Sequence, residues 1–442
     1  MSARCISYLP TFVFVLLVAY VTAYQPYSNG PPIRSDGQGY HIWTFALKKW
    51  DFRFCEYRGL GWAEPGEVPG RCVVRWPPGV ALLRFPVMVW FVNVHNHKSF
   101  SRGEHWVSLL FGAGLTLGIY GLGLSTLRRI KVDPLEAQAI LFLLFFGTGL
   151  FHYGTYDSSY SHVYSAFGSA ILVWQLSRLQ DPRDTGARWW DPWLTAVVAF
   201  FMILFRNTNV LILLFYSALA LQSRTLPTKR RLLGGLCLGS CVAVAIQLSY
   251  NWYATGHFAL SSYVDEPFLW DEPMIGSVLL SYERGLFTYY PVVLFALALG
   301  LARRGSRPFT SALLLLVLLY AALYGFWHSW FLGGGFGHRG FVDLVPLMIP
   351  AVGLSLADID DLASRRWILA AASLTLLIPL QVMIGYWRGT FPFQHPDKTV
   401  YWAHVSHGSS GVLLVAGVLA LFVLTDRLRA AAKAYAGIGR FP

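Results

Sequence analysis

The stretch Arg34-Ser35-Asp36-Gly37-Gln38-Gly39-Tyr40-His41 follows the first long apolar run of the chain, residues 8–24, after about ten residues. That run is long enough to cross most of the roughly 30 Å hydrocarbon layer of a bilayer as a helix. The stretch after it carries one carboxylate, Asp36, between an arginine and two glycines. Charged groups are costly in hydrocarbon, so the chain leaves the membrane before this point.

Composition predicts the same alternation of apolar runs and polar loops along the whole chain. The 442 residues are 55% hydrophobic and 13% charged, with a mean hydropathy of +0.47. Soluble domains carry about 25% charged residues. Arg4 and the apolar residues after it resemble a signal peptide, but no convincing cleavage site follows, so we expect a signal anchor. The chain is predicted to be an all-α polytopic membrane protein.

We expect a bundle of about twelve (11–13) membrane-spanning helices, each of roughly the length that a bilayer requires. The block 192–222 is too long for one span and is interrupted by the polar residues 206–209, so it is divided into two. The expected spans are residues 8–24, 106–127, 136–152, 160–178, the two halves of 192–222, 233–254, 287–302, 309–327, 341–357, 367–386 and 409–426.

The distribution of positive charge predicts the orientation of these spans. The net charge is +12, and with the N-terminus inside, every short cytoplasmic loop contains Lys or Arg, as the positive-inside rule requires. The alternative explanation of the charge, nucleic-acid binding, lacks a basic run or a zinc-finger motif. Polar sequence then accumulates outside, above all in residues 25–105. We expect one transmembrane domain, 1–442, with no separate soluble domain and no nucleotide-binding motif.

The first extracytoplasmic loop, 25–105, has its own expected structure. Residues 39–50 place apolar side chains on one helical side, which predicts a short amphipathic helix lying on the membrane surface. Residues 79–92 are too few to span comfortably, and predict a second surface or half-inserted helix, or part of an irregular span. Cys55 and Cys72 share this loop, where a disulfide and two free thiols are both open alternatives.

Asp36 is the first candidate for chemistry. A carboxylate beside flexible glycines, just outside a span, can reach a site and act as general base toward a hydroxyl or amine. The alternatives are a solvated loop side chain or the N-cap of the following helix. A second group, residues 152–162, compresses His152, Asp157 and His162 between two spans. Substrate binding, interfacial anchoring of the helix ends and a metal site all fit this second group.

Three further groups carry arginines that an anion would satisfy. Arg206 interrupts apolar sequence and requires an anionic partner, either an internal carboxylate or a lipid-linked phosphate. Arg284 stands beside Gly285 and fits either a phosphate or an ion pair with Glu283. His338 and Arg339 end a glycine-rich turn at the start of an expected span, where backbone N–H groups and the helix dipole favour phosphate.

At this point the chain resembles the GT-C superfamily of integral membrane glycosyltransferases, which use polyprenyl-phosphate-linked sugars. It is similar above all to bacterial members related to the rhizobial lipopolysaccharide-core, protein O-mannosyl and aminoarabinose transferases. The resemblance covers nearly the whole chain through five motifs in order: SDGQGY (35–40), YDSSYSHVYS (156–165), RNTN (206–209), ERGLFTYYP (283–291) and GGGFGHRGFVDLVP (333–346).

The resemblance implies a glycosyltransferase of the cell envelope, a multi-pass protein of the plasma or inner membrane with its site on the extracytoplasmic side. Asp36 matches the acidic residue of the family's first outer loop. The resemblance implies that outer-loop acidic and basic residues hold the lipid phosphate; the candidates are Asp157, His162, Arg206, Arg284, His338 and Arg339. The acceptor is a lipid, glycan or protein. The single aspartate, where metal-dependent oligosaccharyltransferases have paired acidic residues, does not support a divalent metal. Rival interpretations are a transporter or flippase of lipid-linked sugars and a non-catalytic envelope-complex subunit.

Overall fold

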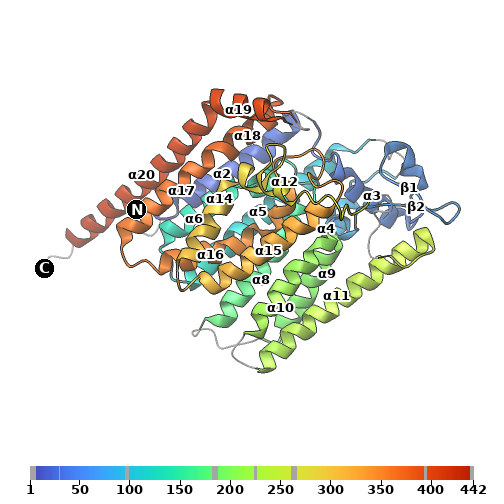
Figure 1. The fold of residues 1–442 in the computed structure, drawn as a ribbon, viewed down its shortest axis with the longest axis horizontal. Helices are drawn as coiled ribbons and strands as arrows, with labels where there is room; N and C mark the ends of the chain where they lie inside the picture. Colours follow the sequence, from blue (N-terminus) through green and yellow to red (C-terminus); the bar gives the residue numbers. More distant parts are fainter. Residues whose placement is uncertain are drawn as a thin grey trace.

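A computed structural model of the chain describes residues 6–28, 30–94, 99–181, 188–222, 226–259, 266–392 and 396–438. Its described residues are mostly helical, with one antiparallel pair of two-residue strands, β1 (Glu64–Pro65) and β2 (Cys72–Val73). Figure 1 shows long helices packed side by side, with α3, β1 and β2 gathered at one end. The protein is therefore an all-α polytopic membrane protein, as composition predicts.

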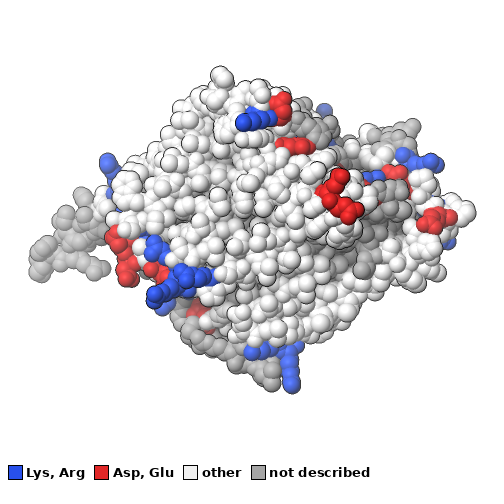
Figure 2. All heavy atoms as spheres, viewed as in Figure 1, with Lys and Arg blue, Asp and Glu red and all other residues white. Residues whose placement is uncertain are grey.

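Every predicted span overlaps a helix, although some, such as 136–152 and 287–302, are divided between two helical segments. Seven described segments are long and apolar enough to cross a membrane: Leu9–Tyr27, Arg102–Arg129, Thr228–Thr255, Arg307–Phe326, Arg339–Ala357, Leu362–Arg388 and Ser410–Ala432. The other five predicted spans fall on helices that are shorter or less apolar: α6 (Pro134–Phe146), α8 (His162–Gln180), α9 (Asp191–Phe205), α10 (Val210–Leu221) and α14 (Pro291–Ala302). Figure 2 shows a broad uncharged zone between charged side chains at opposite margins of this face.

The remaining helices complete the bundle and its ends: α2 (Leu9–Tyr24), α5 (Arg102–Arg129), α7 (Leu150–Thr155), α11 (Leu226–Thr255), α12 (Ile275–Leu280), α13 (Leu286–Tyr289), α15 (Arg307–Phe326), α16 (Val345–Ala357), α17 (Leu362–Ser373), α18 (Leu377–Arg388), α19 (Lys398–His407) and α20 (Ser410–Ile438), with the 3₁₀ turns η1 (Gln25–Tyr27), η2 (Cys55–Leu60), η3 (Asn207–Asn209), η4 (Arg339–Leu344) and η5 (Leu374–Leu376).

The centre of the bundle is the segment formed by η4 and α16. Of its most apolar window 89% is buried, whereas the corresponding figure for α20 is 17%. Helices α5, α6, α8 and α14 all pack against α16, and α20 packs at the edge against α18. Any side chain at the start of η4 is therefore held by the candidate membrane span with the largest buried share.

The first loop forms a small packed unit with its own apolar core. Helix α3 (Asp36–Lys49) packs against α4 (Gly79–Met88), and Trp43 contacts the rings of Phe54 and Tyr250. A disulfide joins Cys55 to Cys72, which decides between the two alternatives left open by the sequence. The helix expected at 39–50 is present, but it begins at Asp36 and is buried over most of its length. It is enclosed by the rest of the loop, because α4, η2 and the end of α11 cover it.

Candidate functional site

The first turn of α3 packs against the turn between α7 and α8. A Cβ on Gly37 would lie 2.0 Å from the Oγ of Ser159, so only glycine permits this approach. One turn further along α3, the hydroxyls of Tyr40 and Ser161 lie 2.8 Å apart and form a hydrogen bond. The turn itself belongs to a segment, residues 151–166, that is buried throughout. Asp36 is thus the first residue of a docked helix and not a solvated loop side chain.

Asp36 forms an ion pair with Arg339. The Nη2 of Arg339 lies 2.7 Å from the Oδ2 of Asp36, with the two side chains 10% and 27% exposed. The guanidinium also lies 5.1 Å from the centre of the Tyr160 ring, in a cation–π contact. Asp36 stands in the first turn of α3, where the helix dipole stabilises a carboxylate. The partly exposed carboxylate is therefore held beside a fixed cation.

A second ion pair lies on the other side of Tyr160. Arg34 donates from Nε and Nη2 to Oδ1 of Asp157 at 2.9 and 2.6 Å. The other carboxylate oxygen accepts from Nε2 of His152 at 2.8 Å and from the hydroxyl of Tyr386 at 3.3 Å. Burial alone would raise the pKa of Asp157, but the charge of Arg34 and the hydrogen bond from His152 lower it well below its usual range. Asp157 remains a carboxylate at any physiological pH.

Tyr160 shows that the two ion pairs are neighbours. Burial raises the pKa of its hydroxyl; the negative charges of Asp157 and Asp36 raise it further, and the positive charge of Arg339 lowers it. One phenol is therefore within electrostatic reach of both carboxylates.

Arg206 has an internal carboxylate as its partner, the first of the two alternatives that the sequence allowed. Its Nε lies 3.3 Å from Oδ2 of Asp343, and its Nη2 donates to the hydroxyl of Tyr324 at 3.0 Å. His162 bridges the pair: Nε2 lies 3.0 Å from Nη1 of Arg206, and Nδ1 lies 3.2 Å from Oδ1 of Asp343. The arginine is thus oriented by three side chains from α8, α15 and η4.

His338 lies among the arginines. Burial lowers its pKa to about 3; the carbonyl of Trp330 opposes this shift, and the charges of Arg206, Arg339 and Arg284 add to it. Neutral His338 donates from Nε2 to that carbonyl at 3.1 Å. Arg206, Arg284 and Arg339, here called the cation cluster, therefore lie around neutral His338 although they come from three distant parts of the sequence.

The glycine-rich turn before His338 is held by two tyrosines. The Tyr153 hydroxyl lies 3.0 Å from both the N–H and the carbonyl of Phe336, and the Tyr290 hydroxyl donates to the same carbonyl at 2.9 Å. Gly337 has φ +57°, and a Cβ there would lie 2.4 Å from the Tyr290 oxygen. The turn is therefore a fixed wall of the site.

Arg284 is buried at the start of α13. Its Nη1 donates to the backbone carbonyl of Glu283 at 2.7 Å. This contact holds one nitrogen of the guanidinium against the main chain. The positive charge of Arg284 interacts electrostatically with the hydroxyl groups of Tyr153, Tyr289 and Tyr290.

The structure brings together all seven residues that the sequence singled out: Asp36, Asp157, His162, Arg206, Arg284, His338 and Arg339. His152 had been named with the group 152–162, and two partners were missed as members of the site, Arg34 and Asp343. Each stands inside a stretch that had been noticed for other residues. The signal that would have found them is the rule that a buried charge requires an opposite charge.

A metal centre built from His152, Asp157 and His162 is not formed. His152 contacts Asp157, whereas His162 contacts Arg206 and Asp343. Over the described residues, no group of three or more His, Cys, Asp or Glu side chains is arranged to hold a metal ion.

Comparison with known proteins finds similarity among solved structures alone. No protein-family model and no curated protein matches the chain. It is similar to the oligosaccharyltransferase AglB of Archaeoglobus fulgidus in complex with an inhibitory peptide and a dolichol-phosphate, with 11% identity, a TM-score of 0.44 and coverage of 95% of this chain and 55% of that one. It is also similar to the oligosaccharyltransferase of the same species in complex with Zn and sulfate, with 12% identity, a TM-score of 0.44 and coverage of 90% of this chain and 53% of that one. The chain spans about half the length of these proteins.

Proposed function

We propose that this protein transfers a glycosyl group from a polyprenyl-phosphate-linked sugar to an acceptor on the extracytoplasmic face of the plasma or inner membrane, with Asp36 as general base. The observation that carries the proposal is the placement of a partly exposed carboxylate 2.7 Å from Arg339, which belongs to the cation cluster. A base next to a set of cations is the arrangement that glycosyl transfer from a phosphate leaving group requires.

The cation cluster supports a phosphate leaving group. Arg284 and Arg339 are nearly fully buried, so their charges act at low dielectric and with little water to reorganise. Nη1 of Arg339 is buried and has no hydrogen-bond partner among the described residues. A phosphate oxygen would satisfy it while Nη2 continues to hold Asp36. Arg206, held by Asp343, would contribute charge from a fixed position.

The reaction is a direct displacement. Asp36 accepts the proton of the acceptor hydroxyl or amine, and the acceptor oxygen or nitrogen forms a bond to the anomeric carbon. The bond from that carbon to the phosphate oxygen breaks, and its electron pair leaves with the polyprenyl phosphate. The nucleophile approaches opposite the leaving group, so the anomeric configuration inverts. The cation cluster stabilises the charge that develops on the phosphate.

The direct test compares Asp36→Asn with Asp51→Asn in the purified full-length protein. Asp51 lies in the same loop, half-exposed and paired with Arg53, with no contact to the site. Asp36→Asn should lower donor consumption by about 10²–10⁴-fold, the usual contribution of a general base, whereas Asp51→Asn should not. The assay incubates each protein with a panel of polyprenyl-phosphate sugars and follows donor loss by mass spectrometry.

Full activity in Asp36→Asn would refute the assignment of the base. A wild-type protein that moves labelled donor across a vesicle membrane without breaking the sugar–phosphate bond would be a flippase, and the proposal would fail. Unchanged thermal unfolding of Asp36→Asn keeps loss of activity separate from loss of fold.

A further inference from the structure

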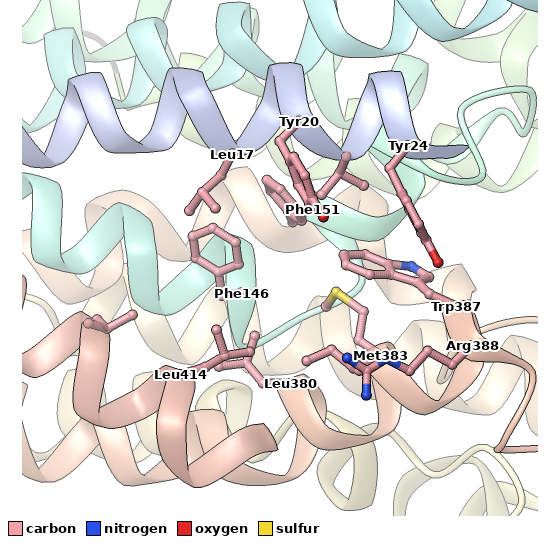
Figure 3. Close-up of a pocket in the computed structure, with 13 residues that line it drawn as sticks. Leu17, Tyr20, Tyr24, Phe146, Phe151, Leu380, Met383, Trp387, Arg388 and Leu414 are labelled. Carbon is pink, nitrogen blue, oxygen red and sulfur yellow. The ribbon is translucent and has the colours of Figure 1, made fainter. Parts of the chain in front are cut away.

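An apolar groove opens between α2, α18 and α20, away from the cation cluster. Its volume is about 320 Å³, and its walls are almost wholly apolar. Figure 3 shows Leu17 and Leu414 toward one end of the groove, and Tyr24, Trp387 and Arg388 at the other. Among the described residues Arg388 makes no ion pair or hydrogen bond, and it is the one charged residue of the lining. Apolar walls with an unpaired arginine at the aromatic end suit a lipid chain with an anionic head.

The groove is connected to Asp157 through Trp387 and His152. The indole Nε1 donates to Nδ1 of His152 at 2.9 Å, and the other ring nitrogen of His152 donates to Asp157. The rings of Tyr156 and Trp387 are stacked, with their centroids 5.5 Å apart. The guanidinium carbon of Arg34 lies 5.1 Å from the centroid of the Tyr156 ring. A single layer of side chains therefore separates the groove from the Arg34–Asp157 pair.

The groove and the cation cluster are separate places in the fold. The groove lies between α2, α18 and α20, and none of Arg206, Arg284 and Arg339 is among its lining residues. Figure 1 shows α2, α18 and α20 on one flank of the bundle and α9 and α10 on another.

We propose that this groove binds the acyl chain of a membrane-anchored acceptor, a lipid that carries a phosphate near its head, and that Arg388 contacts this phosphate. The inference rests on the proposed function. The proposed function assigns the cation cluster to the phosphate of the donor, so a phosphate at Arg388 belongs to a second lipid, the acceptor. A lipid held here would present its head group to Asp36 from the membrane, without crossing the cation cluster.

The binding test uses photoactivatable phosphatidic acid, with a diazirine in its acyl chain, and diacylglycerol with the same chain. The purified full-length protein in phosphatidylcholine nanodiscs should be labelled on α2 and α18. Leu414→Trp fills the groove and should abolish this labelling. The matched control Leu413→Trp, at a neighbouring residue of α20 that is 69% exposed, should leave it unchanged.

Arg388→Ala tests the head-group contact. The wild type should prefer phosphatidic acid to diacylglycerol by about tenfold, the ratio expected for one charge-assisted hydrogen bond, and the variant should lose this preference. Equal labelling of the wild type by both probes would overturn the role of Arg388. Labelling of the groove by photoactivatable polyprenyl phosphate in place of phosphatidic acid would make the occupant the donor and overturn the acceptor assignment.

The activity test adds a total membrane lipid extract to the donor panel and measures glycosylated lipid by mass spectrometry. Leu414→Trp should lose this product, while labelling of the cation cluster by polyprenyl phosphate persists. Normal product formation would reduce the occupant to an ordinary bilayer lipid and overturn the proposal. Donor consumption without groove labelling defeats this inference alone, whereas groove labelling without any donor consumption by the wild type defeats the proposed function.

Discussion

Nη2 of Arg339 lies 2.7 Å from Oδ2 of Asp36, and this contact joins the first loop to the most buried of the seven candidate membrane spans. Asp36 opens α3 and Arg339 opens η4, so both side chains project from the first turn of a helical segment. The ion pair therefore fixes the Asp36 carboxylate, which the first loop supplies, against the helical bundle. The proposed site depends on that fixation, because a general base must be held within hydrogen-bond reach of its substrate.

Replacing Arg339 with lysine should keep the charge but lose the fork that holds Asp36 and reaches the phosphate. We expect donor consumption to fall by about 10²–10³-fold, the usual loss on removal of one donor to a developing anion. Thermal unfolding should change little. Arg307→Lys at the start of α15 is the control. Wild-type kinetics in Arg339→Lys would show that charge alone suffices.

The Arg34–Asp157 pair should contribute strongly to stability, because Asp157 is fully buried and Arg34 is 14% exposed. Removing one partner of a buried pair costs about 3–5 kcal/mol, since the other charge is left uncompensated. Asp157→Asn and Arg34→Gln should each lower the midpoint of thermal unfolding, and the double variant should lose less than their sum. The exposed Asp51–Arg53 pair should show little coupling in the same cycle. Additive losses at Arg34 and Asp157 would contradict this account.

The close approach of Gly37 to Ser159 predicts a rescue. Gly37→Ala should lower stability by about 1–3 kcal/mol through overpacking, and should reduce activity because Asp36 moves with its helix. Ser159→Gly removes the side chain that the new methyl meets and should restore both in the double variant. Gly121→Ala on α5, where an added Cβ meets no atom within 4 Å, should be tolerated. Failure of the rescue would mean that the approach is not set by this contact.

His41 predicts a loss of stability in mild acid. Burial lowers its pKa to about 4, the positive charge of Arg84 adds to this shift, and the hydrogen bond to Glu104 opposes it. In the unfolded chain the pKa is about 6.5. Neutral His41 therefore contributes fully above about pH 6.5, and up to about 3 kcal/mol of this contribution is lost as the pH falls toward about 4.

The measurement is the unfolding midpoint of the wild type and of His41→Gln between about pH 7.5 and about pH 4.5. The wild type should lose stability faster than the variant across this range. Parallel curves for the two proteins would assign the acid sensitivity to another group.

The sequence predicted the spans and singled out the seven candidate residues, because both depend on local signals. A long apolar run predicts a membrane-spanning helix whatever segments pack around it, and charged residues beside such a run are easily recognised. It did not predict the partners of the charges. Asp343 is four residues from Arg339, yet its contacts are Arg206 and His162, from other helices. Helix α3 was expected on a surface because its own pattern is amphipathic, and the packing that encloses it comes from α4, η2 and α11.

By itself, the sequence determined that this chain is a bundle of membrane-spanning helices, with its uncommon charges collected near the ends of those helices. Hydrophobicity is additive along a segment, so a segment carries this information alone. Only the tertiary structure decided which charges meet, that Asp36 faces Arg339, and that a groove lies behind Trp387. Those outcomes depend on close approaches such as Gly37 on Ser159, between residues far apart in the chain, and no local pattern encodes them.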